Sequence, residues 1–426
     1  MKKTIKIAII GAGSNYTPEL IRGIISQSAK DLPIAQITMM DIDAKRLDIM
    51  AGLAERMLKK SGRAIRVCAE RDLKKAVTGV DFVISQIRVG GVDARVLDEK
   101  IPLKYDTLGQ ETTGAGGMFK ALRTIPQMLQ VAQAMHENSP EAILLNYTNP
   151  SGIITEAIVK HSDANIIGLC SGMPAMQAQL KKDLEPFFPN VSSLCVGLNH
   201  LGFMHKIYSN TTEITAEAIQ KMHDLHDGEE DNGCLSIDKL NRVTNAIPIG
   251  YANYYFHRKK KVSGCQTAEK TRGEQIRDIQ KDIFDEAGDP TCCTYPKALA
   301  KRGGGGYSDV TFDCLKAIWN DTSAQLACSV QNRGAVKGID DDAVVEVVCN
   351  IDRRGATPLA VGEIPLAFRG VVQAVKAYES LTVDAAMKQD KNLVYQALLN
   401  HPLVGDIDDI EPLVDELLTA HGLEYS

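Results

Sequence analysis

The first half of the chain alternates short apolar runs with longer stretches of helical spacing. An apolar run at residues 5–10 leads into a glycine turn, residues 16–26 carry apolar positions three and four apart, and a second run at 37–40 follows. Further runs lie at 81–86, 142–145 and 165–169, with helical stretches at about 43–60, 120–137 and 152–160. Strands that alternate with helices favour parallel pairing, so the sequence predicts an α/β fold with a doubly wound, Rossmann-like parallel sheet.

The turn after the first run has the composition of a dinucleotide-binding loop. Gly11 and Gly13 stand where the backbone must turn tightly and let a pyrophosphate approach the amides at a helix N-terminus. Tyr16 replaces the third glycine of G-x-G-x-x-G, so the fingerprint is incomplete, and a glycine turn without a nucleotide stays an alternative. Asp41 ends the second run, where a carboxylate binds a ribose diol and disfavours a 2′-phosphate. The pattern favours NAD over NADP.

A thiol and an imidazole follow two other apolar runs. Cys170 follows the run at 165–169, and His200 follows a run at 194–198. Open α/β sheets bind ligands at the C-terminal ends of their strands, so both side chains are expected at one crevice. They would suit a divalent metal, with substrate oxygens and water completing the shell, because structural zinc takes four protein ligands. Taken singly, such a cysteine or histidine is more often a packed core residue.

Amide and guanidinium groups follow two more runs. Asn149 offers an amide to a sugar hydroxyl or a nicotinamide, and it follows the run at 142–145. Arg88 and Arg95 follow the run at 81–86 and are suited to bidentate capture of phosphate or carboxylate. A surface ion pair would explain each arginine equally well.

The pattern changes beyond residue 198, where strand-like and helix-like segments no longer alternate regularly. A chain of 426 residues has room for about two to three domains. We predict a NAD-binding Rossmann-like domain over 1–195 and a mixed α+β domain over 196–426 that contributes to substrate and metal binding and to oligomerisation. Together they would form a superfold like that of lactate and malate dehydrogenases.

Composition narrows the classes of partner. The net charge is −6, so there is no global basic field to attract nucleic acid or anionic lipid. No apolar stretch reaches the roughly 18 residues of a membrane-spanning helix. Ten cysteines without a CxxC pair are too few for a disulfide scaffold, which favours reduced thiols in a cytoplasm.

A series of motifs, in chain order, resembles glycoside hydrolase family 4, the NAD- and metal-dependent glycosidases, and most closely its 6-phospho-β-glucosidase branch. The motifs are GAGSNYTPEL at 11–20, GQETTGAGG at 109–117, NYTNP at 146–150, GLNH at 197–200, PIGYANYY at 248–255 and RGGGGYSD at 302–309. That branch also has tyrosine at the position of Tyr16. The resemblance runs from residue 5 to about 405.

The resemblance implies hydrolysis of a 6-phospho-β-glucoside, or a similar anionic β-glycoside, by an oxidative route. NAD⁺ takes hydride from carbon 3 of the sugar, the proton on carbon 2 is removed, the aglycone leaves by elimination, water adds to carbon 1 and the hydride returns. Mn²⁺ would stabilise negative charge on the oxygens of carbons 2 and 3. This route needs no pair of catalytic carboxylates.

The resemblance also assigns roles to individual residues, motif by motif. Tyr251 would remove the carbon 2 proton, and Cys170 and His200 would hold the metal. The expected cofactor-binding residues are Gly11, Gly13, Ser14, Tyr16 and Asp41. The expected substrate-binding residues are Arg95, Asn149, Arg88, Glu111, Ser171 and Arg302.

One departure from the family concerns substrate choice. The sequence CSGMP at 170–174 stands where the branch has Cys-Asn-Val-Pro and phospho-α-glucosidases have Cys-Asp-Met-Pro. The aspartate that would act as an acid on α-linked substrates is missing, which favours β-linked ones. Ser171 is also shorter than asparagine, which leaves the need for a 6-phosphate open.

Other functions remain compatible with the sequence. A family 4 enzyme acting on a non-phosphorylated or α-linked sugar is one. A net NAD-dependent dehydrogenase, which would accumulate NADH, is another, and a catalytically silent NAD-binding sensor is a third. The family resemblance implies a homodimer or a homotetramer.

Overall fold

A computed structural model describes residues 4–226, 237–303 and 305–426. Its main sheet has parallel strands β1 (Ile5–Ile10), β2 (Ile34–Met40), β3 (Arg66–Glu70), β4 (Phe82–Ser85), β5 (Ile143–Asn146) and β6 (Asn165–Gly168). Antiparallel strands β11 (Ala324–Gln331), β13 (Val344–Asp352) and β14 (Gly355–Pro358) extend it. The strand order is β14-β13-β11-β6-β5-β4-β1-β2-β3. The parallel part has the order 3-2-1-4-5-6, which is typical of dinucleotide-binding folds and confirms the predicted fold class.

The central parallel strands β1, β4 and β5 are apolar because both of their faces are covered. In β1 only Lys6 is exposed, and every residue of β4 and β5 is buried. The helices of this half are α1 (Thr17–Ser26), α2 (Ala44–Lys60), α3 (Leu73–Val77), α4 (Gly91–Leu103), α5 (Gly114–Asn138), α6 (Ser151–His161) and α7 (Gly172–Leu184). Their starts carry local signals: Pro18 opens α1, and the Asp43 side chain accepts a hydrogen bond from the Arg46 amide at the start of α2.

The helix expected at 120–137 begins earlier, at Gly114. Its first turn reads as a loop in the sequence because it contains three glycines, but the glycines serve close packing. A Cβ on Gly116 would lie 2.4 Å from the Asp98 carbonyl oxygen of α4, and one on Gly117 would lie 2.6 Å from the Thr112 carbonyl carbon. Backbone contact between neighbouring segments therefore overrides the poor helix propensity of glycine.

The second half of the chain mixes strands and helices. Strands β7 (Val191–Leu198), β8 (Leu201–Ser209), β9 (Thr212–Glu213) and β10 (Ile247–Pro248) form an antiparallel sheet, and β12 (Val336–Lys337) pairs with β15 (Gly362–Glu363). The helices are α8 (Thr215–His226), α9 (Ile237–Thr244), α10 (Asn253–Phe256), α11 (Arg258–Thr267), α12 (Arg272–Gly288), α13 (Tyr307–Asn320), α14 (Leu366–Lys388), α15 (Lys391–Asn400) and α16 (Ile407–His421), with short 3₁₀ turns η1 (Gly250–Ala252) and η2 (Lys297–Lys301).

The two halves are joined through one sheet and one hydrophobic core. Residues beyond 195 supply β11, β13 and β14 to the main sheet, and buried side chains of both halves belong to the same core cluster. The predicted division into 1–195 and 196–426 therefore does not run between two separate sheets. Among the described residues no helix is long and apolar enough to cross a bilayer.

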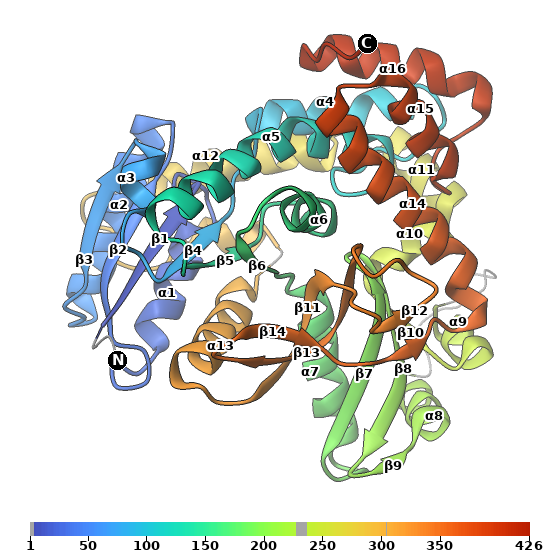
Figure 1. Ribbon diagram of the computed structural model, residues 1–426, viewed down its shortest axis with the longest axis horizontal. Helices are drawn as coiled ribbons and strands as arrows, with labels where there is room; N and C mark the ends of the chain where they lie inside the picture. The colour runs from blue at the N-terminus through green and yellow to red at the C-terminus, as the bar shows by residue number, and fades with distance from the viewer. Residues whose placement is uncertain (1–3, 227–236, 304) are drawn as a thin grey trace.

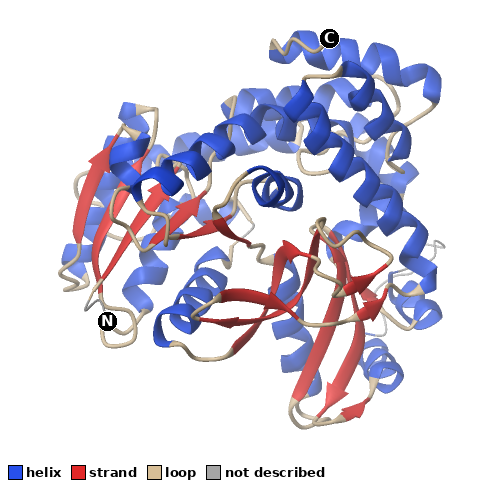
Figure 2. Ribbon diagram, viewed as in Figure 1, coloured by secondary structure: helices blue, strands red, loops and turns tan. Residues whose placement is uncertain are grey.

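Helices of the second half surround the parallel strands. α12 packs against α2 and α4, α13 packs against α1, and α14 packs against α5 and α6. Figure 1 shows α14, α15 and α16 gathered beside α4 and α5 at the C-terminal end of the chain. Figure 2 shows the long strands of β7 and β8 set apart from the parallel sheet. This arrangement brings late segments of the chain to the ends of early strands.

Candidate active site

A large cavity of about 1310 Å³ lies at the C-terminal ends of the parallel strands. It is lined by residues from both halves of the chain. Every predicted site residue borders it: Gly11, Gly13, Ser14, Tyr16, Asp41, Arg88, Arg95, Glu111, Asn149, Cys170, Ser171, His200, Tyr251 and Arg302. The cavity thus joins the glycine turn, the thiol and imidazole, the phenol and the arginines in one space.

The glycine turn after β1 is a cradle that a side chain would fill. Gly11 has φ +85°, and a Cβ there would lie 3.0 Å from the Gln86 backbone. A Cβ on Gly13 would lie 2.8 Å from Asp41 Oδ2, the same oxygen that accepts a hydrogen bond from the Gly13 amide at 2.8 Å. Asp41 thereby fixes the loop, and its carboxylate keeps further lone pairs for a ribose. These residues fit a dinucleotide.

Tyr16 occupies the third glycine position and contacts a distant loop. Its hydroxyl donates to the Gly303 carbonyl at 2.6 Å, and the Arg302 guanidinium lies 4.8 Å from the centre of its ring. One turn further along α1, Glu19 Oε1 accepts from the amides of Gly306 and Tyr307 at 2.7 and 3.0 Å. The helix that follows the glycine turn therefore ties down the segment that carries Arg302. Sequence reasoning missed Glu19, since its partners lie almost 300 residues away.

Cys170 and His200 lie close together at the wall of the cavity. Cys170 lies between β6 and α7, His200 lies in the tight turn between β7 and β8, and their Sγ and Nε2 atoms are 3.8 Å apart. One metal ion can reach both atoms, because a metal–sulfur and a metal–nitrogen bond together span about 4.4 Å. The described residues contain no group of three or more His, Cys, Asp or Glu side chains arranged to hold a metal ion. Further ligands would come from outside the chain.

Burial sets the protonation of this pair and of the neighbouring phenol. Burial raises the pKa of the Cys170 thiol to about 12 and lowers the pKa of His200 to about 4. The imidazole is therefore neutral at pH 7, as a metal ligand must be, and the thiol would ionise on binding a cation. The Tyr251 ring stacks on His200 at 4.0 Å between centroids, and burial raises the pKa of its phenol. The donor set fits a divalent metal.

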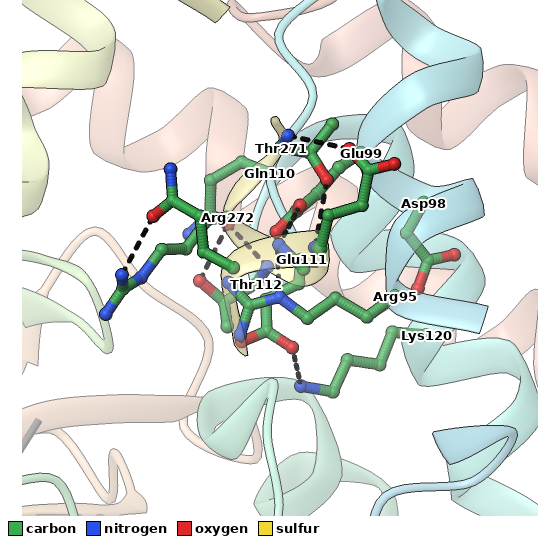
Figure 3. A network of polar contacts seen from close by, with 12 residues as sticks. Arg95, Asp98, Glu99, Gln110, Glu111, Thr112, Lys120, Thr271 and Arg272 are labelled. Atoms are coloured by element: carbon green, nitrogen blue, oxygen red, sulfur yellow. Dashed lines mark hydrogen bonds and ion pairs between the residues drawn. The ribbon is translucent and has the colours of Figure 1, made fainter. Parts of the chain in front are cut away.

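A cluster of charges borders the same cavity. Glu111 accepts from Lys120 Nζ at 2.9 Å and pairs with Arg95 at 2.5 Å and with Arg88. Figure 3 shows Arg95 and Lys120 reaching the Glu111 carboxylate from different helices. Burial alone would raise the pKa of Glu111, but Arg88, Lys120 and Arg95 hold it well below its usual range. Burial and Arg88 lower the pKa of Lys120 to about 7. Glu111 thus gathers two arginines and a lysine at one border of the cavity.

Arg95 is held from its other side as well. Its Nε donates to Glu99 Oε1 at 2.8 Å, and Glu99 Oε2 accepts from the Gly273 amide at 2.6 Å at the start of α12. Figure 3 places Glu99 between Arg95 and Thr271. A carboxylate at a helix N-terminus is favourable, so Glu99 links α12 to the cavity arginines. Lys120 and Glu99 were missed by sequence reasoning; a lysine within the apolar stretch 114–125 was the available signal.

The remaining predicted residues differ in how firmly they are held. The Asn149 amide donates to the Tyr147 carbonyl at 3.3 Å and accepts from the Ser151 amide at 3.4 Å. Arg302 is nearly buried, and its Nε has no hydrogen-bond partner among the described residues. Ser171 precedes α7 without capping it by its side chain. Arg302 thus brings a further unpaired cation to the cavity.

Comparison with known proteins identifies relatives over the whole chain. Residues 6–186 match the family described as Family 4 glycosyl hydrolase, and residues 195–404 match the Family 4 glycosyl hydrolase C-terminal domain. A probable 6-phospho-β-glucosidase of Bacillus subtilis (strain 168) is 36% identical over 99% of this chain and 97% of its own length. A structure of the 6-phospho-β-glucosidase from Thermotoga maritima with manganese, NAD⁺ and glucose-6-phosphate is similar at a TM-score of 0.89 and 31% identity, covering 99% of both chains.

A more distant likeness concerns the fold alone. Malate dehydrogenase from Plasmodium falciparum is similar at a TM-score of 0.51 and 12% identity, over 90% of this chain and 100% of its own. This agrees with the predicted dehydrogenase-like superfold.

Proposed function

The chain belongs to glycosyl hydrolase family 4, and from this premise we propose that it hydrolyses a 6-phospho-β-glucoside, or a similar anionic β-glycoside, with NAD and Mn²⁺ as cofactors. One observation carries the proposal. A single cavity joins a glycine cradle with a ribose-binding carboxylate, a thiol–imidazole pair and a phenol, and it is bordered by surplus positive charge. A simple dehydrogenase would need neither the thiol–imidazole pair nor the phenol.

When bound, NAD⁺ at the glycine turn would supply a hydride acceptor for carbon 3 of the sugar, and a divalent cation at Cys170 and His200 would supply stabilisation of negative charge on nearby oxygens. Tyr251 would remove the proton from carbon 2, because its ring lies against the His200 imidazole and the residue lines the cavity. Asn149 would orient the sugar from the end of β5. The proton leaves carbon 2 and the hydride leaves carbon 3. Because these carbons are adjacent, both transfers can take place within one cavity.

The anionic group of the substrate is assigned to the arginine side of the cavity. Arg88, Arg95 and Lys120 converge on Glu111, Arg95 also pairs with Glu99, and Arg302 has no ion-pair partner among the described residues. A phosphate would satisfy these donors, and the planar guanidinium groups suit bidentate binding. The short Ser171 side chain leaves no carboxylate to protonate an α-linked leaving group, which supports β-linked substrates.

The cysteines bear on the cellular compartment of the enzyme. We place it in the cytoplasm, since the described cysteines are free thiols and a reducing compartment keeps a metal-binding thiol available. Its partner is a small sugar phosphate, with no nucleic acid or membrane component. Assembly as a homodimer or homotetramer is part of the proposal and is measurable by light scattering after gel filtration.

Turnover in deuterated water tests the route. Incubation with a nitrophenyl 6-phospho-β-glucoside, NAD⁺, Mn²⁺ and a thiol reductant should place deuterium at carbon 2 of the product, detected by NMR. Full turnover with the original hydrogen retained at carbon 2 would exclude elimination. Protein stripped of nucleotide should be inactive until NAD⁺ is restored, and steady accumulation of NADH would instead identify a net dehydrogenase.

A further inference from the structure

The metal-site pair is backed by an amide and a buried carboxylate. Asn199 precedes His200 in the β7–β8 turn, and its Nδ2 donates to Glu346 Oε2 at 2.8 Å. Burial and Glu346 raise the pKa of the Cys170 thiol, whereas hydrogen bonds from the Gly172 amide and the Asn199 side chain lower it. Asn199 therefore touches both the sulfur and the carboxylate. Glu346 lies on β13, is 2% exposed and does not border the cavity.

A second buried carboxylate shows what Glu346 lacks. Glu156 on α6 accepts from Lys376 Nζ at 2.7 Å and Lys160 Nζ at 3.0 Å. Burial alone would raise the pKa of Glu156, but these lysines lower it to about 2. Glu346 has no ion-pair partner among the described residues, and burial raises its pKa to about 7. Glu346 Oε1 is buried without a hydrogen-bond partner among the described residues, so this carboxylate lacks the compensation that Glu156 has, and a nearby divalent cation would supply it.

We propose that Glu346 is a positioning residue for a divalent cation held by Cys170 and His200. It orients Asn199, and through Asn199 the Cys170 sulfur, and it adds negative charge behind the cation. The inference rests on the proposed function, because it takes the metal site as its premise.

The physical reason is mutual compensation. Glu346 and the Cys170 sulfur are both hydrogen-bonded to Asn199, so the carboxylate places a negative charge one side chain away from the sulfur. With a divalent cation on the sulfur, both negative charges are compensated, and the carboxylate strengthens binding. Groups that hold metal ligands in this way typically contribute 10- to 100-fold in metal affinity.

The test measures Mn²⁺ binding to the NAD⁺-loaded enzyme, by electron paramagnetic resonance of free Mn²⁺, without substrate. We expect Glu346→Ala to weaken the affinity about 10- to 100-fold. Glu346→Gln keeps an acceptor oxygen for Asn199 but loses the charge, so its loss should be smaller. Because the two residues act in series, Asn199→Ala combined with Glu346→Ala should bind no more weakly than Glu346→Ala alone.

Glu156→Gln is the matched control. Glu156 is a buried carboxylate on α6 that pairs with Lys376 and Lys160 and is not among the groups that shift the pKa of Glu346, so the folded variant should keep wild-type Mn²⁺ affinity. With Co²⁺ in place of Mn²⁺, the sulfur-to-cobalt absorption band reports the Cys170 bond directly. The band should shift in both Glu346 variants and stay in place in the control. Glu346→Gln preserves side-chain volume, so the test survives if the alanine variant does not fold.

The outcomes separate the inference from the proposed function. Wild-type affinity and an unmoved band in both Glu346 variants would overturn the inference and leave the proposed function intact. If Cys170→Ser binds Mn²⁺ as well as the wild type does, the metal site itself is wrong, and both proposals fail.

Discussion

Glu111 and Glu156 are both buried carboxylates beside lysines, and they differ in what surrounds the pair. At Glu156, Lys376 also pairs with Glu379 at 2.5 Å, and the Val344 amide and Ser380 hydroxyl complete the carboxylate's hydrogen bonds. At Glu111, two arginines and a lysine converge on one carboxylate beside the cavity. We therefore expect substitutions at Glu156 to affect stability and substitutions beside the cavity to affect substrate binding and turnover.

We expect the largest effect on activity from a substitution in the cavity, at Tyr251. Tyr251→Phe removes the proposed base and should lower kcat by about 10²- to 10⁴-fold while KM and the melting temperature stay close to wild type. Steady-state kinetics and a thermal melt measure both. Tyr254→Phe is the control, because its ring is 5.9 Å from that of Tyr251 and is not stacked on His200. An unchanged rate in Tyr251→Phe would move the base role to Tyr254, Tyr255 or water.

At Glu156 we expect the opposite result, a loss of stability without a loss of activity. Glu156→Gln leaves Lys376 and Lys160 without a carboxylate and should cost about 3 kcal/mol of unfolding free energy, with kcat of the folded protein unchanged. The pKa of Glu156 is lowered to about 2 in the folded protein, so its contribution is present above pH 4.5 and is lost as the pH falls through 2. Urea unfolding at pH 7 and pH 3 should give a smaller difference between variant and wild type at pH 3. Loss of kcat without loss of stability would reverse the assignment.

Lys120 offers a further test, because its titration should make the stability of the protein depend on pH. Its pKa is lowered to about 7 in the folded protein, below that of the unfolded chain, so its charge opposes folding most below pH 7. Stability should therefore rise between pH 7 and pH 9 by about 2 kcal/mol more in the wild type than in Lys120→Met. Parallel urea titrations at both pH values measure this difference. Equal pH dependence in the two proteins would show that Lys120 stays protonated throughout.

The smallest expected effect concerns the tie between the glycine turn and the Arg302 segment. Tyr16→Phe removes one hydrogen bond to the Gly303 carbonyl and should cost about 1 kcal/mol, seen as a several-fold rise in KM for the phosphorylated substrate. Tyr105→Phe removes a hydroxyl that donates to Glu416 away from the cavity and should leave KM unchanged. A KM increase of equal size in both variants would indicate a general loss of stability.

Much of the site was predictable because it is built from strand ends. Gly11, Asp41, Asn149 and Cys170 each follow an apolar run, and parallel strands bring the ends of such runs to one edge. Local pattern and one topological rule were sufficient for these residues. His200 also follows an apolar run, although its strand β7 belongs to the antiparallel sheet. The family motifs added Tyr251, which lies on a segment without a clear pattern of its own.

The supporting residues were not predictable in the same way. Glu346 lies within a strand whose residues Val344–Ile351 are almost all buried, so simple alternation would not reveal whether its carboxylate faces a metal site or solvent. Glu19 and Glu99 act on amides of Gly306 and Gly273, which are far away in sequence. Their roles depend on how α12 and α13 pack, and that packing is a property of the whole fold. A charged residue inside an apolar stretch is the only local sign they leave.

Strand β6 is bordered on both sides, by β5 from the first half of the chain and by β11 from the second. A polypeptide ending near residue 195 would leave one flank of β6 without a neighbour, and a bare flank readily recruits foreign strands. Cys170, which follows β6, would then lie at the open edge of a sheet and not within a continuous sheet. Replacing either half of the chain by that of another protein would therefore disrupt the backbone pairing of β6, whether or not the catalytic residues were kept.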